Sequence, residues 1–235
     1  MDFFSEYLKG LNDRLLNKRE IELIYKSLNR YFNSGVQGIK FDTFNNSPIR
    51  YDFNSNIVLV DYENALKYFE SYTIDCSNNI QIINYLIVFS IIHELFHAKQ
   101  IIEQDRELVR IYKYCYSLLN DTHHGLSRAL TQVIYNKLHD YLAIEVNANI
   151  EAYRAILLIS EDDIYNYFYN SLIEYINKVY VDYDLVNMYK YLEYKIDKDE
   201  FNDMSSETRI KKGVYLSKKI NSIDELNIDS LLAVN

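Results

Sequence analysis

The apolar run IQIINYLIVFSII, residues 80–92, constrains the fold of this chain more than any other segment. It contains no charged residue, and it leads directly into His93 and Glu94. Spanning a bilayer takes about 20 apolar residues, so the run is too short to be a membrane helix by that measure. The sequence therefore predicts a buried helix here.

Glycine and proline are scarce, with five glycines and one proline, Pro48, among 235 residues. This scarcity predicts long helices with few sharp turns. Helical patterns cover residues 3–16, 19–32, 64–72, 79 to about 119 and 127–160, and further helices follow. Short strands with turn signals between them are predicted at 39–44, 49–53 and 56–62. We expect an α+β fold, predominantly α-helical, with a small sheet preceding the apolar helix.

Charge and cysteine content restrict the class of protein. The net charge of −9 and the lack of a long basic run argue against nucleic-acid binding, which needs clustered Lys and Arg. Residues 1–20 do not resemble a signal peptide, because their apolar stretches are short and interrupted by charge. Cys76 and Cys115 do not form a disulfide framework. We expect a cytoplasmic chain with no membrane or nucleic-acid partner.

The stretch FSIIHELFHAKQ, residues 89–100, has the spacing of a zinc-binding helix. Residues four apart lie on one helical face, so the imidazoles of His93 and His97 can hold one zinc ion. Glu94 is turned about 100° from His93, so it can accept a proton from a metal-activated water instead of ligating. A surface histidine pair is the alternative, but the apolar context makes burial without partners costly.

Catalytic zinc takes three protein ligands and one open position, so a third ligand is needed. On a helix, Glu145 lies in a mainly apolar stripe formed by Leu138, Tyr141, Leu142, Ala148, Asn149 and Ala152. A lone buried carboxylate is costly unless it is paired or bound to a metal, which favours Glu145. His123, His124 and His139 are the other candidates, and His123 or His124 stays open as a competing third ligand.

His93-Glu94-x-x-His97 followed by Glu145-x-x-x-Asn149 resembles the gluzincin zinc metallopeptidases, the thermolysin-like group. The resemblance implies a zincin-like fold and one zinc ion on His93, His97 and Glu145, with Glu94 as general base. In that group an Asp stands at the position of Asn149 and braces a ligand histidine. The Asn149 amide can still accept an imidazole N–H, although it carries no charge.

The resemblance covers roughly residues 55–155 and implies two further features. In these enzymes an edge strand before the HExxH helix pairs with the extended substrate, and residues 56–62 are the candidate by chain order. A buried central strand is the alternative reading of that segment. Peptide hydrolysis also needs a donor for the oxyanion, and Tyr153, one turn beyond Asn149, is our candidate. His123, His124, His139 and Arg154 are others.

We therefore expect a single zincin-like domain over residues 1–235, with a catalytic core at about 36–160 and a C-terminal helical extension, 161–235, packed on it. The expected function is zinc-dependent hydrolysis of peptide bonds in a peptide or protein substrate. The alternative is a zincin-scaffold binding or regulatory protein with structural zinc and no peptidase activity. Hydrolysis of a non-peptide bond is a third reading, because the same activated water attacks several electrophiles. The sequence sets no oligomeric state.

Overall fold

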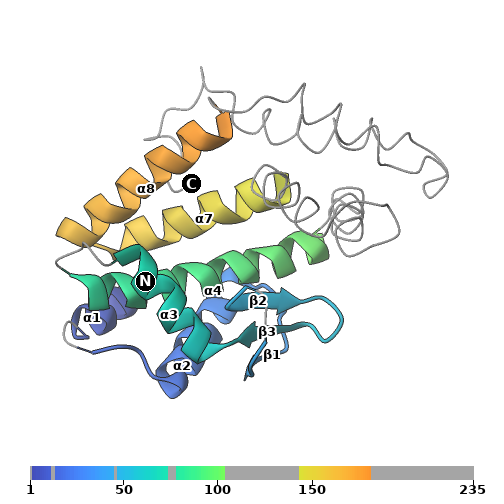
Figure 1. Cartoon of the computed structure of the whole chain (residues 1–235). Coiled ribbons are helices and arrows are strands. Elements are labelled where there is room, and N and C mark those ends of the chain that lie inside the picture. The colour runs from blue at the N-terminus through green and yellow to red at the C-terminus, as the bar shows by residue number, and fades with distance from the viewer. Residues whose placement is uncertain (1, 12–13, 45–46, 74–77, 104–142, 181–235) are drawn as a thin grey trace, which may run out of the picture. The chain divides into compact units, whose positions relative to one another are not determined.

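The computed structural model describes residues 2–11, 14–44, 47–73, 78–103 and 143–180. Its helices are α1 (Asp2–Lys9), α2 (Lys18–Phe32), α3 (Tyr62–Thr73), α4 (Asn79–Glu103), α7 (Ala143–Ile159) and α8 (Asp162–Tyr180). Its strands are β1 (Gly38–Phe41), β2 (Ile49–Asp52) and β3 (Ile57–Val60). The described residues are mostly helical with one small sheet before α4, so the predicted α+β class is confirmed (Figure 1).

The chain divides into two compact units, residues 1–104 with 148–172, and residues 105–147 with 173–235. The described residues of the first unit hold the sheet and most of every helix. Those of the second are the first turn of α7 and the end of α8, each continuous in its helix with residues of the first. The predicted core and C-terminal extension stay predictions.

The sheet places β3 in its centre, in the order β1-β3-β2. β3 runs parallel to β1 and antiparallel to β2, which precedes it in the chain. Val58 and Val60 of β3 are fully buried. The interpretation of residues 56–62 as an edge strand is therefore wrong, and the central-strand alternative holds. The reason is that β1 and β2 pair with opposite sides of β3, which chain order alone does not disclose.

Helix α4 is the buried helix that the apolar run predicts. It packs against β2, β3, α1, α2 and α3. On its other side, the Tyr85 hydroxyl donates to the Ile159 carbonyl of α7 at 3.3 Å, and the Tyr85 ring lies near Phe168 of α8. Its fully buried side chains include Ile83, Ile87, Val88, Ile91, Ile92 and Leu95. This packing explains an apolar run that carries no amphipathic pattern.

By length and composition, α4 is also the one helix among the described residues that could cross a membrane. The stretch Asn79–Gln100 has a mean hydropathy of 1.4, and 56% of it is buried inside the protein. A core helix of a soluble protein has the same properties. Cytoplasmic location and the lack of a membrane partner stay predictions.

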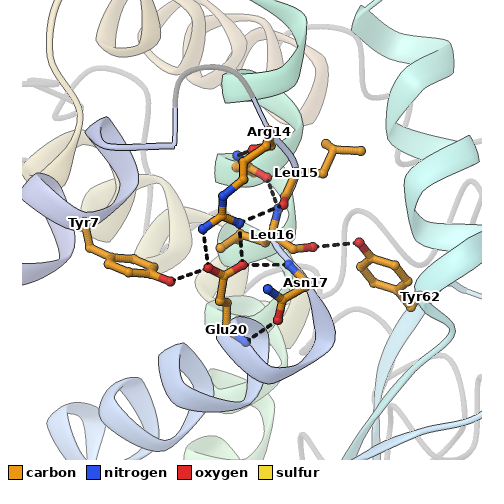
Figure 2. Close-up of polar contacts among 8 residues, drawn as sticks. Tyr7, Arg14, Leu15, Leu16, Asn17, Glu20 and Tyr62 are labelled. Carbon is orange, nitrogen blue, oxygen red and sulfur yellow. Dashed lines mark hydrogen bonds and ion pairs between the residues drawn. The ribbon is translucent and has the colours of Figure 1, made fainter.

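The first helix ends earlier than its sequence pattern suggests, at Lys9 instead of residue 16. The chain before α2 adopts a capping arrangement (Figure 2). The Asn17 side chain accepts from the Glu20 N–H at 3.1 Å, and Glu20 Oε2 accepts from the Asn17 N–H at 2.9 Å. This reciprocal pair is a capping box, and it starts α2 directly after an extended Asn17.

The segment before α2 is also tied to α4 and α3. The side chain of Asn84, which is fully buried on α4, accepts from the Leu16 N–H at 2.8 Å and donates to the Arg14 carbonyl at 2.9 Å. The Tyr62 hydroxyl of α3 donates to the Leu16 carbonyl at 2.7 Å (Figure 2). One buried amide thus satisfies two backbone groups that would otherwise be costly to bury.

Glu20 is the centre of this cluster. The Arg14 guanidinium donates from Nη1 to Oε2 at 2.8 Å and from Nη2 to Oε1 at 2.6 Å, and the Tyr7 hydroxyl donates to Oε1 at 2.7 Å (Figure 2). The hydrogen bonds from Arg14 lower the pKa of the Glu20 carboxyl to about 2, against the opposing effect of burial. The ionised form is therefore the form that the fold stabilises.

We expect Glu20→Gln to lower the free energy of unfolding at neutral pH by about 1–3 kcal/mol, because it removes charge-assisted hydrogen bonds from Arg14. A carboxyl with a depressed pKa stabilises the fold above its unfolded value of 4.5, and that contribution disappears as pH falls towards about 2. The stability difference between wild type and variant should therefore shrink over this interval, as measured by denaturant unfolding at a series of pH values.

Glu22→Gln is the matched control for this prediction. Glu22 lies on the same helix and pairs with Lys26 at 2.6 Å, but both side chains are exposed. An exposed ion pair contributes about 0–1 kcal/mol. A Glu20 variant that behaves like the Glu22 variant at every pH would show that the cluster adds no more than a surface pair.

Candidate metal centre

His93 and His97 lie one turn apart on α4, with their side chains facing each other. Their Nε2 atoms are 2.8 Å apart, and the two rings are nearly perpendicular at 88°. His97 is buried, with 5% of its surface exposed, whereas His93 is half-buried. Helical geometry alone produces this approach, because residues i and i+4 lie on one face.

Glu145 lies in the first turn of α7 with 1% of its surface exposed. Ala148 and Ala152, one and two turns further along, are fully buried, as the sequence stripe predicts. The structure brings Glu145 to the two histidines: one ligand atom from each of the three side chains lies within 4.8 Å of the other two.

The three side chains suit one metal ion. Two imidazole nitrogens and one carboxylate oxygen are a known donor set for zinc, with bonds of roughly 2.0–2.2 Å. On a tetrahedral ion such atoms lie roughly 3–3.5 Å apart. The two imidazole Nε2 atoms are 2.8 Å apart, and all three ligand atoms lie within 4.8 Å of one another, so the side chains must adjust to reach this spacing. Their role as ligands stays a prediction that this geometry favours.

The Glu94 side chain turns towards the sheet, not towards the ligand atom of His93. Its Oε2 accepts a hydrogen bond from the Tyr51 backbone N–H of β2 at 2.7 Å. Alternate residues of an antiparallel strand direct their backbone groups away from the partner strand, so this N–H belongs to the outer edge of β2. On the same edge, the Ile49 carbonyl accepts from Ser47 Oγ at 2.8 Å. β2 is therefore the edge strand that lies beside Glu94.

Gln100 contacts one of the proposed ligands, His97, although the sequence did not single it out as a site residue. His97 Nδ1 lies 3.1 Å from Gln100 Oε1. Its spacing of three residues from His97 was the available signal, since residues i and i+3 on a helix are neighbours.

The two other predicted site residues lie on α7. Asn149 is half-buried one turn after Glu145, and its bracing of a ligand histidine stays a prediction. The Tyr153 ring packs against Phe89, one turn before His93, with centroids 4.8 Å apart, and its edge also approaches Phe168 of α8. Tyr153 therefore belongs to an aromatic cluster beside α4, and its oxyanion role stays a prediction.

The remaining alternatives divide between two parts of the chain. Arg154 pairs with Glu151, and both side chains are partly exposed, so the oxyanion role of Arg154 stays a prediction. His123, His124 and His139 lie outside the described residues. The competition between His123 or His124 and Glu145 for the third ligand position is therefore left to experiment.

Comparison with known proteins adds no family to this geometry. No family model, no curated protein and no solved structure matches the chain.

Proposed function

We propose that this chain is a zinc-dependent metallopeptidase of gluzincin type with a zincin-like fold. The observation that carries the proposal is the convergence of His93, His97 and Glu145, whose ligand atoms lie within 4.8 Å of one another. Two of these residues, His97 and Glu145, are buried. Buried imidazoles and carboxylates are expected to be paired or to bind a metal. The motif spacing and the geometry support the same set of ligands.

Zinc is the proposed metal because the donors are two imidazoles and one carboxylate. This set leaves a fourth position on a tetrahedral ion, which is the pattern of catalytic sites. When bound, zinc supplies a Lewis acid that lowers the pKa of water and polarises a carbonyl group. Harder cations such as magnesium prefer all-oxygen sites.

Glu94 is the proposed general base. The Tyr51 N–H holds Glu94 Oε2 at 2.7 Å, which fixes the plane of the carboxylate. Oε1 is then the oxygen that accepts a proton from the attacking water and passes it to the leaving amine.

The proposed substrate is an extended peptide that pairs with β2. Its edge faces Glu94, so β2 replaces residues 56–62 as the proposed pairing strand. Main-chain hydrogen bonds to a sheet edge recognise peptides without strict sequence preference. Ser47 and Glu94 engage two backbone groups of this edge, so a peptide would pair with β2 only by displacing one of them or by using the groups beside them.

The second candidate is a binding or regulatory protein that keeps the zincin scaffold with structural zinc. The deep burial of His97 and Glu145, 5% and 1% exposed, favours it, because structural zinc is usually enclosed. Zinc that is bound tightly by a protein unable to cleave any peptide or intact partner would select this candidate.

The direct test uses the full chain, purified without added metal and analysed by mass spectrometry for bound metals. We expect about one zinc per chain and cleavage of members of a peptide library. We also expect chelation to abolish cleavage and zinc to restore it. A chain that binds no zinc, or one that still cleaves peptides after complete removal of the metal, would contradict the proposal.

A further inference from the structure

The imidazole of His97 is held at both of its nitrogen atoms. Nδ1 lies 3.1 Å from Gln100 Oε1, and Nε2 lies 2.8 Å from His93 Nε2. All three residues lie on the C-terminal half of α4. A single helix therefore carries all the atoms of these two contacts.

These two contacts determine where the protons lie. A neutral imidazole carries one N–H, and a carboxamide oxygen only accepts hydrogen bonds. Facing Gln100 Oε1, His97 Nδ1 must therefore carry the proton and donate it. His97 Nε2 is then the unprotonated nitrogen, and it is the ring atom that lies 2.8 Å from His93 Nε2.

We infer that Gln100 is a positioning residue that presets His97 for metal binding. The inference rests on the proposed metal centre. With its proton held on Nδ1 by Gln100 Oε1, His97 presents Nε2 as the nitrogen that can ligate.

The carboxamide thus acts through His97 in the way that acceptors beside ligand histidines generally act, fixing the tautomer and the ring orientation. Loss of such a partner typically costs about 10- to 100-fold in metal affinity. Gln100 follows His97 by three residues, whereas Asn149 lies on α7, so the two amides act from different helices.

The first measurement is made on the metal-free full chain with ¹⁵N-labelled histidine. Long-range ¹H–¹⁵N correlation distinguishes the two tautomers of each ring. We expect His97 to be protonated at Nδ1 in wild type and in Gln100→Glu, which keeps an acceptor oxygen. In Gln100→Ala we expect this preference to be lost. Finding His97 protonated at Nε2 in wild type would mean that the Gln100 amide nitrogen faces the ring, and would overturn the inference.

The second measurement is zinc affinity by competition with a chromophoric chelator. We expect Gln100→Ala to bind zinc about 10- to 100-fold more weakly than wild type. Gln81→Ala, the same substitution near the other end of α4, is the matched control and should bind as wild type does. Equal affinity of Gln100→Ala and Gln81→Ala would overturn the positioning role.

The two measurements separate this inference from the proposed function. A wild-type chain that binds no zinc overturns the proposed function, and the tautomer spectrum of the same metal-free sample still decides whether Gln100 orients His97. A chain that binds zinc and cleaves peptides equally well with and without Gln100 overturns the inference alone.

Discussion

Replacing Glu94 by glutamine is expected to lower kcat/KM for peptide cleavage by about 10²- to 10⁴-fold, the usual contribution of a general base. Glutamine has the same shape, and its carbonyl oxygen can still accept the Tyr51 N–H. The change therefore removes the basic oxygen and leaves the contact between α4 and β2 in place. The measurement is the steady-state rate on a cleaved library peptide, with the zinc content of each sample determined in parallel.

Glu70→Gln is the control for this experiment, because Glu70 is an exposed residue of α3. It should cleave at the wild-type rate. A Glu94 variant as active as this control would remove Glu94 from the mechanism. Loss of zinc together with activity would identify Glu94 as a ligand, which contradicts the role proposed for it.

Replacing Glu145 by glutamine is expected to weaken zinc binding beyond the roughly 10- to 100-fold loss that follows removal of an outer partner. A ligand that binds only the folded state stabilises it by about 2.7 kcal/mol at a concentration 100-fold above its Kd. Wild type should therefore show a zinc-dependent rise in Tm. At the same free zinc concentration the variant should show little or none.

Glu151→Gln provides a matched control on the same helix. Glu151 is partly exposed and pairs with Arg154, and it is not one of the three converging side chains. This control should keep the full zinc-dependent rise in Tm. If Glu145→Gln keeps it too, Glu145 is not the third ligand, and His123→Ala and His124→Ala become the next variants to measure.

The parts of the site that the sequence predicts are those that local helical geometry determines. The approach of His93 to His97 needs only a helix, and the apolar run before them ensures that this helix is buried. Glu145 is some fifty residues away, yet the residue pattern of its own helix identifies it as a candidate ligand. A carboxylate in a stripe that includes Ala148 and Ala152 has a physical reason to face something charged.

The features that the sequence does not predict depend on pairing between distant segments. The order of the sheet follows from which side of β3 each neighbour occupies, and no residue pattern in three four-residue strands records that choice. The contact between Tyr51 and Glu94 joins residues 43 positions apart and uses a backbone group, which carries no sequence signal.

The hydrogen bonds of Asn84 have a consequence for the order of events in folding. Its amide joins Leu16 and Arg14, which lie 68 and 70 positions away in the chain. The entropic cost of closing so long a loop precedes any gain from the two bonds. These two bonds therefore form only when the segment before α2 meets a folded α4. We infer that docking of the N-terminal segment is a late step, and that the helix bearing the histidines is ordered before it.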